Sequence, residues 1–136
     1  MTGNELIEQF ERGTTPADSF HHADHVRLAY EYLSRYPVLK ALEKFSGALK
    51  QFAAAQGKTQ LYHETITWAY LFLIRERMAR ASDRQTWEEF AADNSDLLTW
   101  ERGCRGILGR YYQPETLGSE AARTSFLLPD KSAATV

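Results

Sequence analysis

The chain has little of several features that would point to particular classes of protein. It contains one cysteine, Cys104, which excludes an internal disulfide framework and indicates a reducing compartment. Its longest apolar run, residues 68–74, stops at Arg75 and is too short to span a membrane. The net charge of -2 lacks the positive excess that would attract nucleic acid or an anionic membrane. Residues 1–5 lack the basic start and apolar core of a secretory signal, so we expect a cytoplasmic protein.

What the sequence does contain is helical periodicity along most of its length. Apolar residues recur at spacings of three and four, and no alternating run is typical of a strand. The pattern predicts an all-α fold, with one compact domain over residues 1–130 and a flexible tail over residues 131–136. We expect a bundle of about five to seven helices, with the fourth at its centre because it is apolar around most of its circumference. The expected helices are a short first one ending before Gly13, then 22–36, 37–56, 62–81, 87–92, 97–111 and 119–123.

All four histidines lie in two short clusters, residues 20–25 and 62–67. Each cluster stands at the start of a predicted apolar helix. His22 and His25 are spaced so that a helix presents them on one face, with Cβ atoms about 5–6 Å apart. Two imidazoles at that spacing can converge on one metal ion, and His21 is a reserve candidate.

The second cluster places His63 on the stripe of its helix that also carries apolar residues, so its ring is expected to face the core. If the two helix starts lie at the same end of the bundle, His22, His25 and His63 can share one site. They would supply three nitrogens to a zinc, iron or copper ion. Glu64 would be a fourth ligand or the general base, at a helix start where the dipole favours a carboxylate. Neither cluster matches an established metal motif such as His-Glu-x-x-His.

Residues around these histidines complete the predicted site. Tyr62 and Thr67 are expected to orient the ligands beside Glu64 in the catalytic centre. A small organic substrate would enter between the helix starts, where aromatic rings can form walls and an arginine fork can position an anionic group. The residues predicted to contact it are Trp68, Tyr111 and Arg123. A structural alternative remains for each, since the two aromatic residues suit a core and Arg123 can form an ion pair with Asp130.

Five motifs together resemble a small bacterial family without an assigned activity. They are Phe-x-His-x-x-His-Val at 20–26, Tyr-His-Glu-Thr-x-Thr at 62–67, Tyr-Tyr at 111–112, Ser-x-x-Ala-Arg at 119–123 and Pro-Asp at 129–130. The resemblance implies that these residues belong to one site. It implies no reaction, cofactor or substrate.

Three hypotheses follow from these residues. The leading one is a small metal-dependent enzyme, a hydrolase, lyase or oxygen-using oxidoreductase, that acts on a small organic substrate. The second is a metal-free module whose polar cluster binds a small ligand. The third is a structural network that joins helix ends, in a protein that functions as a homodimer. All three predict no nucleic-acid or membrane partner.

Overall fold

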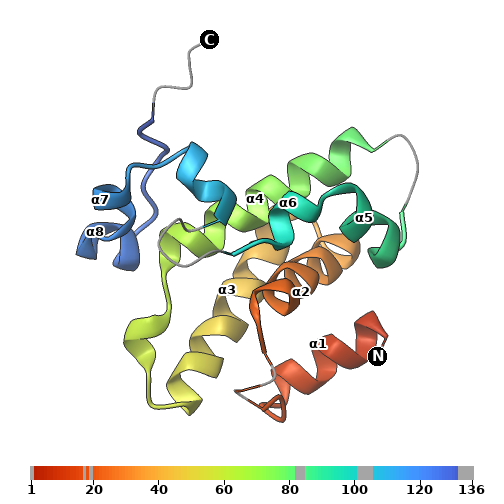
Figure 1. Ribbon diagram of the computed structural model, residues 1–136. Coiled ribbons are helices and arrows are strands. Elements are labelled where there is room, and N and C mark those ends of the chain that lie inside the picture. Colours follow the sequence, from red (N-terminus) through yellow and green to blue (C-terminus); the bar gives the residue numbers. More distant parts are fainter. Residues whose placement is uncertain (1, 17, 19, 82–84, 101–105, 132–136) are drawn as a thin grey trace.

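The computed structural model describes residues 2–16, 18, 20–81, 85–100 and 106–131, and these residues form helices joined by turns (Figure 1). No strand occurs among them, so the predicted all-α fold is confirmed. The longer helices are α1 (Gly3–Glu11), α2 (His22–Arg35), α3 (Val38–Ala55), α4 (Glu64–Arg80) and α5 (Trp87–Asp93). The shorter elements are α6 (Ser95–Leu98), α7 (Pro114–Leu117), α8 (Glu120–Thr124) and the 3-10 turns η2 (Thr59–Leu61) and η3 (Gly106–Arg110).

Helix α4 lies at the centre of the molecule, as its apolar circumference predicts. It contacts α2 and α3 on one side and α8 and η3 on the other, while α1 packs against α2 and α3 (Figure 1). Leu71 and Ile74 of α4 are completely buried, and so is Tyr32 of α2. Burying such side chains is the main favourable term in folding, so α2 and α4 contribute much of the core. None of the helices in the described ranges is both long and apolar enough to cross a membrane.

Gly57 fixes the turn after α3, and it directly follows the helix predicted over residues 37–56. Gly57 has a φ of 68°, a left-handed conformation that costs glycine little. Its N–H donates to the carbonyl of Ala54 at 2.9 Å, and the next N–H, of Lys58, donates to that of Ala53 at 2.9 Å. These bonds satisfy carbonyl groups at the end of α3, and the chain then turns through η2 into α4.

The prediction of one helix over residues 97–111 is wrong. Helix α6 ends at Leu98, and Gly106 begins the separate turn η3 with a φ of 61°. A Cβ atom at Gly106 would lie 2.4 Å from the hydroxyl oxygen of Tyr70 and 2.8 Å from the carbonyl oxygen of Thr99. The backbone therefore approaches α4 too closely for an ordinary helical residue at this point. Cys104 lies outside the described residues.

The segment after α8 is tied back onto the molecule. Thr65, completely buried in α4, donates its hydroxyl to the carbonyl of Ser125 at 2.8 Å and accepts from the N–H of Leu127 at 3.1 Å. The ammonium of Lys131, the first residue of the predicted tail, donates to the carbonyl of Gly109 at 2.6 Å. Residues 132–136 lie outside the described residues.

Candidate functional site

A cavity of about 730 Å³ lies where α2 and α4 begin and α3 ends. Its remaining walls are η2, Trp100 and the residues that link α7 to α8. Segments distant in the sequence therefore enclose one space. The lining residues are His22, His25, Val26, Phe45, Leu49, Phe52, Ala53, Gln56, Lys58, Gln60, Leu61, Tyr62, His63, Ile66, Thr67, Tyr70, Trp100, Leu117, Gly118, Ser119, Glu120 and Arg123.

Most of the residues singled out in the sequence line this cavity. The histidines come from two helix starts, His22 and His25 from α2 and His63 from the residue that caps α4. The other predicted residues on the walls are Tyr62, Thr67 and Arg123. Glu64, Trp68 and Tyr111 are not among the lining residues.

The ring of His22 is held by the backbone of α6. Its Nε2 lies 2.9 Å from the carbonyl oxygen of Leu97, and because a carbonyl only accepts, Nε2 carries the proton. Arg77 of α4 fixes α6 in turn, donating to both carboxylate oxygens of Asp96 at 3.0 and 2.8 Å. The ring of Trp100 lies beside the imidazole, with centroids 4.9 Å apart. Burial lowers the pKa of His22 below its ordinary 6.5, and the Leu97 carbonyl opposes this in part.

His63 uses both of its ring nitrogens within the protein. Nδ1 accepts the N–H of Ile66 at 3.1 Å, which caps the start of α4, and Nε2 donates to the carbonyl of Leu117 at 2.7 Å. This pair of bonds requires the neutral imidazole with its proton on Nε2. His63 therefore joins the start of α4 to the end of α7.

His25 also lines the cavity, and it differs from His22 and His63 in its hydrogen bonding. Its ring packs against that of Phe20, with centroids 4.3 Å apart, and within the described ranges no hydrogen bond engages it. Burial and, to a smaller extent, the neighbouring His22 together lower the pKa of His25 to about 4. At neutral pH the side chain is uncharged and offers one donor and one acceptor.

The predicted metal centre of His22, His25 and His63 is wrong. In the part of the chain that the structure describes, no three His, Cys, Asp or Glu side chains form a group that could hold a metal ion. The physical reason is that backbone groups orient the imidazoles. Both ring nitrogens of His63 form hydrogen bonds to backbone groups, and Nε2 of His22 donates to the carbonyl of Leu97. His22, His25 and His63 therefore do not form the predicted three-histidine ligand set. The metal-dependent enzyme is therefore not supported.

The carboxylate of Glu64 is engaged by Tyr62 and lies near Lys50. The Tyr62 hydroxyl donates to the Glu64 carboxylate at 2.6 Å, and the ammonium of Lys50 lies 3.8 Å from the same oxygen. Lys50 also lies over the Tyr62 ring, 5.2 Å from its centroid. Burial, together with the bond to Glu64, raises the pKa of Tyr62 above its usual value. Tyr62 is thus an uncharged wall of the cavity held in one orientation.

Of the three residues predicted to contact the substrate, one lines the cavity and two do not. Arg123 lines the cavity, and its guanidinium pairs with Glu120 instead of Asp130. Trp68 stacks on Phe126 away from the lining residues, with centroids 5.2 Å apart. The backbone carbonyl of Tyr111 accepts from the N–H groups of Asp130 and Lys131 at 3.1 and 3.0 Å, so its observed contacts are structural.

Several residues that line the cavity were not predicted from the sequence. Phe45 and Leu49 have the helical spacing of ordinary core positions of α3, and both are indeed buried as well as lining the cavity. Trp100 lies beyond a helix end that was predicted to continue. Its 40% exposure could not be derived from a helical pattern. Thr65, which lies within the second motif but does not line the cavity, has backbone partners about 60 residues away in the chain.

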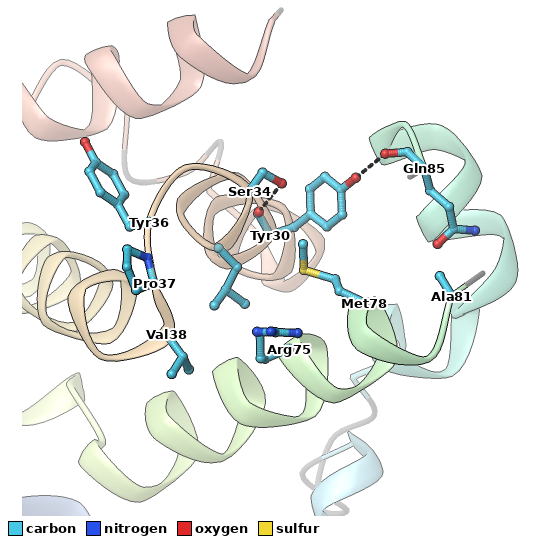
Figure 2. A pocket seen from close by; sticks show the side chains of 10 residues that line it. Tyr30, Ser34, Tyr36, Pro37, Val38, Arg75, Met78, Ala81 and Gln85 are labelled. Atoms are coloured by element: carbon cyan, nitrogen blue, oxygen red, sulfur yellow. Dashed lines mark hydrogen bonds between the residues drawn. The ribbon is translucent and has the colours of Figure 1, made fainter. Parts of the chain in front are cut away.

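A second cavity, of about 530 Å³, lies between the end of α2 and the last turns of α4. Figure 2 shows Arg75 and Met78 of α4 facing Tyr30 and Ser34 of α2 across it. The protein itself uses several of its polar groups: the Tyr30 hydroxyl donates to the Gln85 carbonyl at 2.6 Å and the Ser34 hydroxyl to the Tyr30 carbonyl at 2.8 Å (Figure 2). None of the residues of the two sequence motifs lines it. The larger cavity is therefore the better candidate.

Comparison with known proteins identifies no relative. No family model matches the chain, and no curated protein or solved structure matches it either. The resemblance of the five motifs to a small bacterial family stays a prediction.

Proposed function

We propose that this chain is a metal-free binding module that holds one small organic molecule in the 730 Å³ cavity. The observation that carries the proposal is that His22, His25 and His63, from two separated motifs, line the same space. Cavities of about 300–1,000 Å³ are the size at which proteins bury most of a small ligand. We also infer that the protein acts in the cytoplasm, which its single cysteine supports.

The walls suit a ligand that is mainly apolar. Val26, Phe45 and Leu49 are buried and offer hydrocarbon surface at the inner end. Leu61 and Trp100 line the same cavity and are 67% and 40% exposed. Large apolar side chains left open to solvent beside a cavity are a common sign of a binding site, because a ligand can cover them.

The polar groups of the cavity suit recognition by hydrogen bonding. His22 and Tyr62 are fixed by Leu97 and Glu64, so they need no rearrangement before a ligand arrives. His25 retains a donor and an acceptor for the ligand. A purely structural role explains the hydrogen bonds of His22 and His63 to backbone carbonyls. It does not account for the cavity or for the absence, among the described residues, of a hydrogen bond to the ring of His25.

The proposal can be tested by screening a library of small aromatic and aliphatic fragments with saturation-transfer NMR. Each cavity has one alanine on its wall, Ala53 in the larger and Ala81 in the smaller, so tryptophan can be introduced at either. Ligands of the larger cavity should lose binding in Ala53→Trp and keep it in Ala81→Trp. Fragments that bind both variants equally, or a library without any ligand, would contradict the proposal.

A further inference from the structure

The inner part of the larger cavity is built from uncharged groups. Burial holds the pKa values of His22 and His25 below the ordinary value and that of Tyr62 above it, so all three are neutral at pH 7. Thr67 and Tyr70 beside them are buried. A charged ligand group placed here would lose its hydration and meet no opposite charge, which is costly.

The charges of the lining residues lie at the rim. Lys58 and Glu120 are exposed and Arg123 is half-buried, so the polar heads of all three are near solvent. Arg123 is already paired with Glu120, and Lys58 makes no ion pair or side-chain hydrogen bond within the described ranges. The rim therefore has a net positive charge of one, carried by a lysine without an acidic partner.

We propose that the ligand is an amphipathic monocarboxylate, whose uncharged apolar body enters the cavity while its carboxylate stays at the rim beside Lys58 and Arg123. This inference rests on the proposed function, because it names the class of molecule that the same cavity binds. The carboxylate keeps part of its hydration at the rim and gains attraction from the unpaired ammonium. An ammonium in the same place meets repulsion from Lys58, and an amide meets neither effect.

Three probes with the same bicyclic body separate these cases: naphthalene-1-acetate, naphthalene-1-acetamide and 2-(1-naphthyl)ethylamine, each titrated into the full chain by calorimetry. The acetate should bind about two- to fivefold more tightly than the amide, as expected of an exposed charge pair, and the amine should bind most weakly. Added salt should reduce the difference between acetate and amide.

Variants with opposite expected effects make the test specific to the rim. Lys58→Gln should remove most of the acetate's advantage, whereas Glu120→Gln, which releases Arg123, should increase acetate affinity several-fold. In both variants the affinity of the amide should change less than that of the acetate. Lys44→Gln is a matched control, because the Lys44 ammonium lies over the Tyr36 ring, 4.9 Å from its centroid, and lines neither cavity. Glu115→Gln, on α7, is the corresponding control for the acidic change.

The outcomes distinguish this inference from the proposed function. Binding of the amide and the acetate with equal affinity, or an acetate preference that survives Lys58→Gln, overturns the carboxylate inference and leaves the cavity as a binding site. Absence of binding by all three probes, together with an empty fragment screen, overturns both.

Discussion

His63 and Leu117, 54 positions apart in the chain, are joined by a hydrogen bond of 2.7 Å from the imidazole Nε2 to the carbonyl oxygen. The same ring caps α4 by accepting the N–H of Ile66 on Nδ1. One neutral side chain thus caps the start of α4 and also holds the end of α7 against it. A residue predicted from the sequence to bind a metal ion instead connects two helices at the wall of the cavity.

His63→Ala is expected to lower the free energy of unfolding by about 1–3 kcal/mol, since it removes a helix cap and a hydrogen bond to a carbonyl. His63→Asn should cost less, about 0.5–1.5 kcal/mol, because asparagine is a good capping residue but is too short to reach Leu117. Urea unfolding of the two variants measures the difference. Equal losses would show that the cap contributes nothing beyond the Leu117 bond.

The free energy of unfolding is expected to fall as the pH falls from about 6.5 to about 4, in part because of His25. An unfolded histidine takes up a proton near pH 6.5, whereas His25 in the folded state does so only near pH 4. Between these values the unfolded state binds more protons, so acid favours unfolding, by roughly 1–3 kcal/mol for this one group.

Comparison of the wild type with His25→Gln isolates that contribution. Glutamine does not titrate, so the loss of stability between about pH 7 and pH 4.5 should be smaller in the variant than in the wild type. Urea titrations at both pH values measure the two losses. Parallel losses in the two proteins would mean that His25 is protonated as easily in the folded as in the unfolded state.

Leu71→Ala should reduce the free energy of unfolding by about 2–5 kcal/mol, because its side chain is completely buried against the other central helices. Leu73, two residues later, is only partly buried, so Leu73→Ala should cost clearly less. Thermal or urea unfolding of both variants tests this ranking. The reverse order would mean that the core lies on a different face of α4.

Much of the fold could be predicted because helical spacing is a local property. The positions of α2, α3 and α4, the cap at Gly57 and the last helix after Ser119 all follow from residues that are close in sequence. The interruption after Leu98 could not be derived in the same way. It depends on Gly106 lying against Tyr70, a contact between residues far apart in the chain.

The grouping of the histidines could be anticipated, but their chemical roles could not. Two helix starts with polar residues can meet at one end of a bundle, and His22, His25 and His63 do line one cavity. The partners that orient them are the carbonyls of Leu97 and Leu117. Every residue has a backbone carbonyl, so the sequence does not indicate which carbonyl will accept a hydrogen bond from a histidine ring. A cluster of histidines therefore has the same sequence whether its ring nitrogens are free or already hydrogen-bonded.

The walls of the cavity come from both ends of the described chain, His22 near one and Arg123 near the other. The cavity is therefore completed late in folding and synthesis. Helices α2, α3 and α4 can pack before the wall between α7 and α8 has formed. Closing contacts between residues so far apart is slow compared with forming the helices themselves. On the ribosome, the cavity can be completed only after Arg123 has emerged, so a nascent chain that ends before α8 lacks part of its wall.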